Sequence, residues 1–200
     1  HDADVNANLA NPDGRKEAIA KVGELTGGSL DAVIANAGSA LPNPLTVSIN
    51  YFGAVSIIEG LRPLLLRSAA PRVAATSSMA SLMPNDSELV DLMLAGKENE
   101  ALARAQALVE IGGGMEGLIY GSSKRALSRW IRRECIKPEW AGAGIPLNAV
   151  GPGIVKTPMV AEMIATQEGR DALAQAVPMP LNGYIEPENI AALLIWLTSE

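Results

Sequence analysis

The feature that most constrains the fold is an alternation of helical patterns with short, almost wholly apolar runs. We expect strands at residues 30–35, 72–76 and 146–150, and a further short strand at residues 4–9. Runs that are apolar at nearly every position are typical of strands buried on both faces, as in a parallel sheet. Strands that alternate with helices therefore predict an α/β chain with a parallel sheet.

The expected helices are marked by caps and breakers. Asn11 and Pro12 suit a helix cap followed by proline at the first helical position, and the glycines at residues 27–28 end that helix. A second helix is expected over residues 46–68, where Pro63 should kink or split it. Later helices are expected around Tyr120 and from Glu186 to Leu197.

Composition narrows the function classes. The chain has 200 residues, of which 48% are hydrophobic and 19% charged, enough for one globular domain with a single core. A net charge of −6 argues against a nucleic-acid surface, so the arginines between residues 125 and 133 are interpreted as a solvated helix face. No apolar run reaches the roughly 18 residues of a membrane span, so we expect no membrane partner.

Cysteine and histidine are scarce. The single cysteine, Cys135, rules out an internal disulfide and suits a reducing compartment, so we expect a cytoplasmic protein. The only histidine is His1. Serine–histidine hydrolase chemistry and the usual zinc sites therefore lack their parts, and we expect no metal.

Tyr120 and Lys124 lie four residues apart in a predicted helix, so their side chains share one face. A fixed cation beside a phenol stabilises the phenolate, which lets the hydroxyl give and take protons near neutral pH. The same spacing also fits a packed tyrosine and an ordinary surface lysine. The pair is therefore a hypothesis that depends on its context.

That context comes from the ends of the predicted strands. Small or polar residues follow three of them, at residues 36–38, 77–78 and 151–153. Each ending fits an ordinary turn. In parallel sheets, however, ligands bind outside the carboxyl ends of the strands, and small residues there let a flat cofactor approach the backbone.

Several motifs follow one another in a fixed order along nearly the whole chain. They are Asn-Ala-Gly at residues 36–38, Val-Ser-Ile-Asn-Tyr-Phe-Gly at 47–53, Ser-Ser at 77–78, Tyr-Gly-Ser-Ser-Lys at 120–124, Asn-Ala-Val-Gly-Pro-Gly at 148–153, and Thr157. This ordered set resembles the short-chain dehydrogenase/reductase family. The resemblance implies a Rossmann-like, doubly wound parallel sheet and an NAD(P)-dependent oxidoreductase.

The resemblance also implies roles for four catalytic residues. Tyr120 matches the family's general acid and base, and Lys124 matches the lysine that supports it and binds the nicotinamide ribose. Ser78 matches the serine that orients the substrate oxygen, whereas Ser77 is interpreted as a structural hydroxyl. Asn50 matches the asparagine that anchors a water-linked proton relay to the lysine.

Cofactor and substrate residues follow from the same resemblance. Besides Tyr120 and Lys124, the expected cofactor-binding residues are Asn8, Leu9, Asn36, Ala37, Gly38, Gly153, Ile154 and Thr157. Substrate contacts are expected from Ser78, Met159 and Met163, within an apolar segment at residues 155–182 that also fits the packing of a short lid helix. We expect a hydrophobic secondary alcohol or its carbonyl form, with steroid, aryl and simpler substrates all open.

The sequence departs from the family pattern at both ends. The glycine-rich phosphate loop, the first βαβ portion and the last strand have no counterpart, so we expect residues 1–200 to be a single but incomplete dinucleotide-binding domain. The residue that selects NAD or NADP would precede His1. Together with Asp2-Ala3-Asp4-Val5, an insertion at about residues 84–114 resembles the bacterial 3α-hydroxysteroid dehydrogenase/carbonyl reductase subgroup, which uses NAD.

The insertion is expected to form a helical hairpin around Ala95 and Gly96. Its apolar stripes need a partner, so we favour a subunit interface, in a homodimer or homotetramer, over a cover for the substrate mouth. The alternative function is a catalytically silent dinucleotide-binding or regulatory module on the same fold. An epimerase of the related extended group needs a larger substrate domain than this chain has room for.

Overall fold

The computed structural model describes residues 3–199, and within them the chain is built on a parallel sheet. The strands are β1 (Ala32–Ala35), β2 (Arg72–Thr76) and β3 (Leu147–Val150), in the order β1-β2-β3. Val33 pairs with Val73, which in turn pairs with Leu147. The predicted α/β class with a parallel sheet is confirmed.

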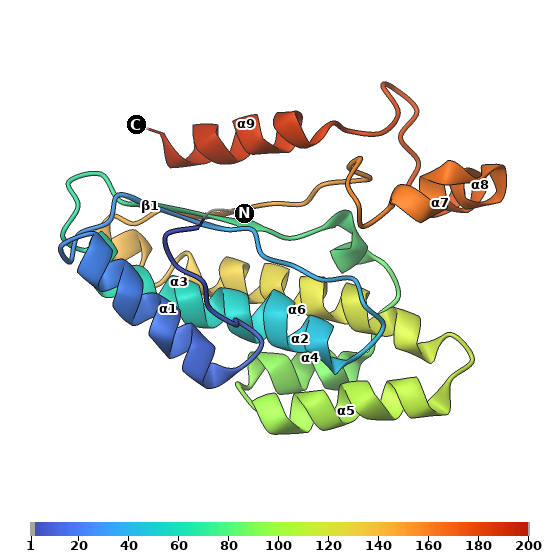
Figure 1. The fold of residues 1–200 in the computed structure, drawn as a ribbon, viewed down its shortest axis with the longest axis horizontal. Helices are drawn as coiled ribbons and strands as arrows, with labels where there is room; N and C mark the ends of the chain where they lie inside the picture. Colours follow the sequence, from blue (N-terminus) through green and yellow to red (C-terminus); the bar gives the residue numbers. More distant parts are fainter. Residues whose placement is uncertain (1–2, 200) are drawn as a thin grey trace.

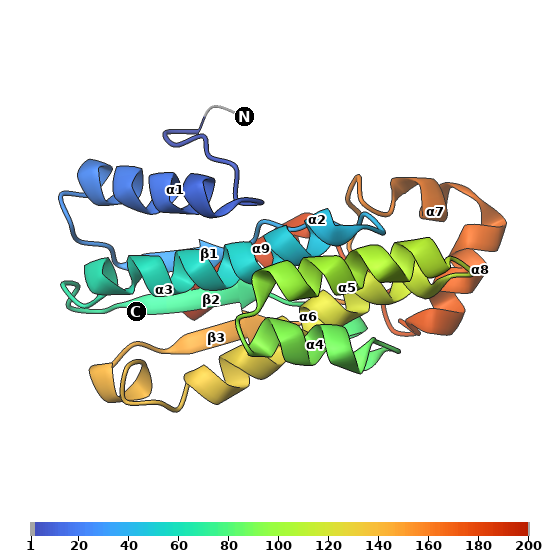
Figure 2. The ribbon, with the colours of Figure 1, turned by 90° about the horizontal axis from the view of Figure 1, so that it is seen from below.

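Helices cover both faces of this sheet (Figures 1 and 2). On one face, α3 packs against β1 and β2, α6 packs against β3, and α1 lies beside α3; α9 covers the opposite face. A helical hairpin of α4 and α5 forms an outer layer on α6. The bounds are α1 (Pro12–Leu25), α3 (Ala54–Leu65), α4 (Ser87–Leu94), α5 (Glu98–Ile111), α6 (Leu118–Glu134) and α9 (Pro187–Thr198).

The hydrophobic core is divided unequally by the sheet. The main cluster joins Val33, Val73 and Leu147 to buried side chains of α3, α4, α5 and α6. The cluster on the α9 face holds only Ala74, Val150 and Leu194, with partly buried neighbours. The packing of α3, α4, α5 and α6 on this face of the sheet is therefore the main source of hydrophobic stabilisation.

The three strands of the sheet agree with their predicted bounds to different degrees. Residues 72–76 form β2 as expected, and residues 147–150 lie within the predicted third strand. The first strand is shorter than predicted, and burial on both of its faces is wrong for Ile34, whose side chain is 42% exposed. β1 has a strand neighbour on one side only among the described residues, so it is less covered than a central strand.

The strand expected at residues 4–9 is wrong. Its described residues form irregular structure, and the Leu9 carbonyl accepts a hydrogen bond from Arg15 Nε instead of from a strand. The helix after it matches the prediction: Asn11 caps α1 by accepting from the Gly14 amide, with Pro12 at the first helical position. Left-handed Gly27 and Gly28 follow its end.

The helix expected at residues 46–68 is irregular in a different place from the one predicted. It consists of α2 (Pro44–Val47), a π-helical stretch η1 (Ser48–Gly53) and α3, and Pro63 lies inside α3 without splitting it. Pro63 is in the last turns of α3, where the backbone bond it removes belongs to the exposed Glu59. The π-helical stretch, by contrast, lies within the buried part of the helix.

The predicted hairpin of the insertion is confirmed as α4 and α5, with left-handed Gly96 at the turn. The reason for expecting an interface is wrong, because the apolar stripes pack inside the chain. Leu89, Met93 and Leu108 are all fully buried in the main core. The stripes therefore already have their partner.

Residues between β3 and α9 leave the body of the fold as a long excursion. It contains loops and two short helices, α7 (Ala161–Ala165) and α8 (Gln167–Ala176), at the right of Figure 1. A parallel bridge between Val155 and Ile185 closes its base. Among residues 3–199, no helix is both long and apolar enough to cross a membrane.

Candidate active site

Lys124 is the charged group at the centre of the site. Its helix, α6, buries a face that includes Ile119, Leu127 and Trp130, and this packing fixes the side on which Lys124 projects. The ammonium Nζ donates to the Thr76 carbonyl, at the end of β2, over 2.8 Å. The residue is only 4% exposed, and burial lowers the pKa of its ammonium from 10.5 to about 8.

Tyr120 stands one helical turn before Lys124. The Lys124 Nζ lies 5.9 Å from the centre of the Tyr120 ring, and both side chains line the same cavity. The spacing of four residues therefore places the phenol and the ammonium together, as the sequence predicted.

Two serines follow β2. Ser78 lines the cavity, and its Oγ accepts from the Ala80 amide at 3.1 Å, capping the 3₁₀ helix η2 (Met79–Leu82). Ser77 Oγ donates to the Lys124 carbonyl at 3.2 Å and is 2.6 Å from Ser128 Oγ. Ser77 thus makes the contacts of a structural hydroxyl that joins the strand end to α6.

Asn50 is fully buried in η1, behind the cavity wall. Its Oδ1 accepts from the Ser39 amide, and its Nδ2 donates to the Ser39 carbonyl and to Ser123 Oγ, over 2.8 to 3.0 Å. A Cβ placed on Gly38 would lie 3.4 Å from Asn50 Oδ1 and 3.7 Å from Lys124 Nζ. Because Gly38 has no side chain, a narrow gap remains between its backbone and these two polar groups.

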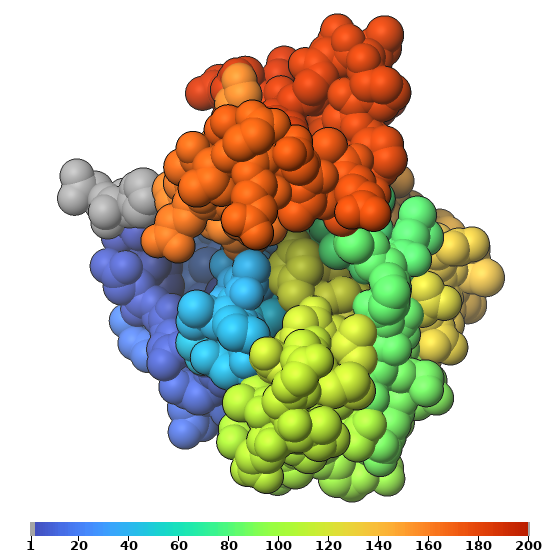
Figure 3. Space-filling model, turned by 90° about the vertical axis from the view of Figure 1, so that its right-hand side faces the viewer, coloured from blue at the N-terminus to red at the C-terminus, as the bar shows by residue number. Residues whose placement is uncertain are grey.

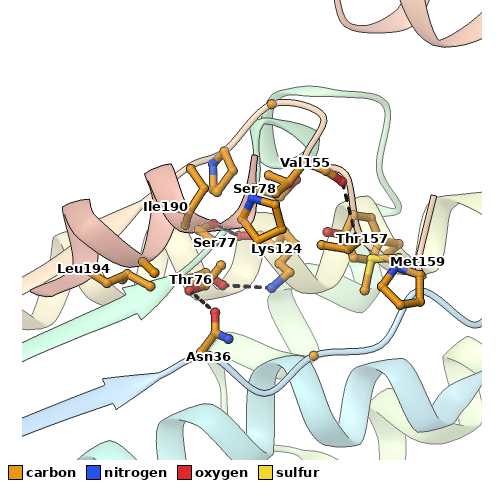
Figure 4. A pocket seen from close by; sticks show the side chains of 17 residues that line it. Asn36, Thr76, Ser77, Ser78, Lys124, Val155, Thr157, Met159, Ile190 and Leu194 are labelled. Carbon is orange, nitrogen blue, oxygen red and sulfur yellow. Dashed lines mark hydrogen bonds between the residues drawn. The ribbon is translucent and has the colours of Figure 1, made fainter. Parts of the chain in front are cut away.

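These elements enclose a cavity of about 760 Å³ at the carboxyl end of the sheet. Figure 3 shows a hollow below the orange segment that contains α7 and α8, and Figure 4 shows Lys124 directed toward Thr76 and Asn36. The lining residues are Asn36, Gly38, Thr76, Ser77, Ser78, Tyr120, Lys124, Pro152, Gly153, Val155, Thr157, Pro158, Met159, Pro187, Ile190, Ala191 and Leu194.

Two parts of this wall were missed by reading the sequence. Thr76 contributes a backbone carbonyl to Lys124, and its Oγ1 donates to Asn36 Oδ1 at 2.7 Å. Every residue type has a backbone carbonyl, so the sequence does not reveal which one binds Lys124. The predicted end of the strand at residue 76 was the one available indication. α9 lines the cavity through residues such as Ile190 and Leu194, whose helical spacing is that of any core helix.

Some predicted site residues lie outside the cavity wall. Asn8 bonds the Ala10 amide and Leu9 bonds Arg15, whereas Met163 is exposed on α7. The Ile154 amide donates to Met179 Sδ at 3.2 Å, and a Cβ on Gly153 would come within 3.0 Å of that sulfur. The members of the predicted set that do not line the cavity are Asn8, Leu9, Ala37, Asn50, Ile154 and Met163. The hydrogen bonds of Asn50 go to Ser39 and Ser123.

The cavity suits the nicotinamide and ribose end of a dinucleotide. Gly38 and Gly153 line its wall without a side chain, and Lys124 and Asn36 add polar groups. Lys124 has one hydrogen-bond partner for its three donors, the Thr76 carbonyl, among the described residues. A ribose hydroxyl is a suitable further acceptor for this ammonium.

Comparison with known proteins agrees with this geometry. The family model described as enoyl-(acyl carrier protein) reductase matches residues 1–200. A 3-alpha-hydroxysteroid dehydrogenase/carbonyl reductase of Comamonas testosteroni is 32% identical over 204 residues, which span 99% of this chain and 77% of that protein. The chain belongs to the short-chain dehydrogenase/reductase family. It is therefore an NAD(P)-dependent oxidoreductase by family.

Solved structures give the same family fold. The crystal structure of a Pseudomonas 3-alpha-hydroxysteroid dehydrogenase complexed with NADH superposes with a TM-score of 0.86, at 33% identity, over 100% of this chain and 77% of that one. The NADP complex of Pseudomonas aeruginosa RhlG has a TM-score of 0.71 at 23% identity, over 98% of this chain and 69% of that one. The predicted Rossmann-like architecture is thereby confirmed.

Proposed function

We propose that this oxidoreductase interconverts a hydrophobic secondary alcohol, of steroid-like or aryl type, and the corresponding carbonyl compound, using NAD. The observation that carries the proposal is the meeting of three groups at one cavity. Tyr120 and Lys124 come from α6, and Ser78 comes from the end of β2, yet all three line the same wall. A module that only bound a dinucleotide would have no need of a phenol and a hydroxyl beside the ammonium.

Each residue has a distinct part in the proposed reaction. The Tyr120 hydroxyl takes the proton of the alcohol during oxidation and returns it to the carbonyl oxygen during reduction. The Lys124 ammonium stabilises the negative charge that develops on the phenol oxygen, and the Ser78 hydroxyl holds the substrate oxygen in position. Asn50 anchors the path by which protons reach Lys124. A bound nicotinamide supplies the hydride transfer.

The cavity wall supports the substrate class. Val155, Met159 and Ile190 give it an apolar side, opposite the polar groups at the strand ends. Apolar walls with a few convergent polar groups suit a largely hydrophobic ligand. The name of the Comamonas testosteroni relative, a hydroxysteroid dehydrogenase/carbonyl reductase, also favours steroid-like alcohols among the possibilities.

NAD is proposed over NADP because the Pseudomonas relative, at 33% identity, is complexed with NADH. A cytoplasmic location completes the proposal. The location rests on the single free cysteine, which suits a reducing compartment.

The proposal is tested by mixing the protein with NAD and a panel of steroid, aryl and simple secondary alcohols and following nicotinamide absorbance. We expect turnover that favours the larger apolar alcohols. Binding of NAD without turnover of any alcohol or ketone would contradict the enzyme and favour the silent dinucleotide-binding module.

Tyr120→Phe tests the assignment of the acid and base. The variant keeps the ring and loses the hydroxyl, so we expect kcat to fall by about 10² to 10⁴ with NAD binding retained. Tyr184→Phe is a matched control, because Tyr184 does not line the cavity. Equal activity in the two variants would remove Tyr120 from the proposed role.

A further inference from the structure

Arg15 is a buried charge that the proposed chemistry does not use. The residue is 3% exposed, and its Nε donates to the Leu9 carbonyl at 2.7 Å. Nη1 and Nη2 donate to the two carboxylate oxygens of Glu98 at 2.8 and 2.7 Å. Nη2 also donates to the Ser48 carbonyl at 3.1 Å. One guanidinium thus joins three segments that are far apart in the sequence.

The Ser48 carbonyl belongs to the first residue of η1, the π-helical stretch that contains Asn50. A π-helical turn is wider than an α-helical turn and is rarely stable without support from its surroundings. A Cβ placed on Gly53 would lie 3.2 Å from both the Ser48 and the Leu9 carbonyl oxygens. The Ser48 and Leu9 carbonyl oxygens therefore lie close together beside Gly53, the last residue of η1. The Arg15 guanidinium donates a hydrogen bond to each of them.

The contacts continue from η1 to the catalytic helix. Asn50 Nδ2 donates to Ser123 Oγ at 3.0 Å, and Ser123 precedes Lys124 in α6. Ser123 Oγ in turn donates to the Tyr120 carbonyl at 2.7 Å. These two hydrogen bonds connect η1 to the turn of α6 that carries the proposed acid and base.

Glu98 comes from the insertion and is the first residue of α5. α5 packs against both α2 and η1, so the carboxylate reaches Arg15 from a helix that already covers the irregular stretch. The fork of the guanidinium matches the two carboxylate oxygens, which gives the pair a fixed geometry. Without Glu98, the buried Arg15 charge would keep only carbonyl partners.

We propose that Arg15 and Glu98 are positioning residues through which the insertion holds the π-helical turn of Asn50 against α6. Neither side chain lines the cavity. Loss of the pair should therefore lower kcat while leaving KM for the alcohol and for NAD near their original values. This kinetic expectation rests on the proposed function, whereas the position of η1 can be measured without any activity.

The experiment compares Glu98→Gln with Glu100→Gln in the full chain. Glu100 is the matched control, because it lies in the same first turn of α5 and its ion pair is with the exposed Lys97. At a temperature where both variants are folded, we expect kcat to fall roughly tenfold or more in Glu98→Gln alone. We also expect the ¹⁵N NMR signals of the Asn50 side-chain amide to shift in Glu98→Gln and not in Glu100→Gln.

A Glu98→Gln protein that is less stable but keeps both the Asn50 signals and kcat would overturn the proposal, since the pair would then be a stability element only. If Glu98→Gln does not fold, native-state hydrogen exchange of the unaltered chain decides. The amides of η1 and those of residues 102–105, in the second turn of α5, should open with the same free energy, and separate opening would overturn the proposal. A chain that turns over no alcohol would contradict the proposed function, while the NMR and exchange results would still decide this inference.

Discussion

At the scale of single residues, Lys124 makes the sharpest prediction. Its burial lowers the ammonium pKa to about 8, so the side chain loses its proton in a range where an exposed lysine keeps it. ¹³C NMR of lysine-labelled protein without ligand should show one side-chain signal that titrates near pH 8. That signal should be missing from Lys124→Met, and its persistence in the variant would contradict the assignment.

The same shift links Lys124 to folding. Between about pH 8 and 10.5 the unfolded chain holds this proton and the folded chain does not, so the free energy of unfolding should rise with pH in that window. The shift corresponds to about 3 kcal/mol in full. Urea denaturation at pH 7.5 and 9.5 should show a smaller rise in Lys124→Met, and equal rises in both proteins would contradict the link.

Reading the sequence placed Tyr120 and Lys124 on one helix face because helical spacing is a local property. It did not find the Thr76 carbonyl or the buried Arg15 and Glu98 pair. Backbone acceptors have no residue signature, and Arg15 and Glu98 are 83 positions apart in the sequence. What such residues contact depends on how distant segments meet, which local patterns do not encode.

At the scale of elements, the fit of α6 against the segment after β2 depends on Gly121. A Cβ at this position would lie 3.0 Å from the Pro84 carbonyl oxygen and 3.4 Å from that of Ala80. We expect Gly121→Ala to destabilise the protein by about 1 to 2 kcal/mol, because overpacking outweighs the better helix propensity of alanine. Its activity should also fall, since the displaced segment follows Ser78.

Gly117→Ala is the control, because Gly117 has helical dihedrals and a Cβ there would meet no atom within 4 Å. That variant should be neutral or up to about 1 kcal/mol more stable. Urea denaturation measures both changes. Equal stability of the two variants would mean that α6 lies farther from the 80–84 segment than the structure has it.

The elements also show where sequence patterns fail. Residues 72–76 were predicted well because a short apolar run with clear breakers has few alternatives. The π-helical turn at residues 48–53 was not predicted, since its sequence has the same apolar spacing as a regular helix. Residues 4–9 alternate polar and apolar side chains as a strand does, yet Asp, Asn and Ala are poor strand formers, and the Leu9 carbonyl accepts from Arg15.

At the scale of the whole molecule, the sheet separates a thick layer from a thin one, and the two should differ in local stability. α6 packs on the main core, whereas α9 contributes Leu194 to a small cluster with Ala74 and Val150 and is connected to β3 by a long excursion. Fewer buried apolar contacts mean a smaller free energy for local opening. Amides of α9 should therefore exchange with solvent faster than amides of α6.

Hydrogen exchange followed by mass spectrometry tests this difference on peptides that cover residues 187–198 and 118–134. Leu194→Ala should speed exchange in the α9 peptides and leave the α6 peptides nearly unchanged, because Leu194 is 5% exposed and belongs to the small hydrophobic cluster on the α9 face. Leu193→Ala, at a 41% exposed position on the same helix, should change neither. If α9 and α6 exchange together in the unaltered chain, the sheet does not divide the molecule into separately opening layers, and α9 belongs to the same cooperative unit as α6.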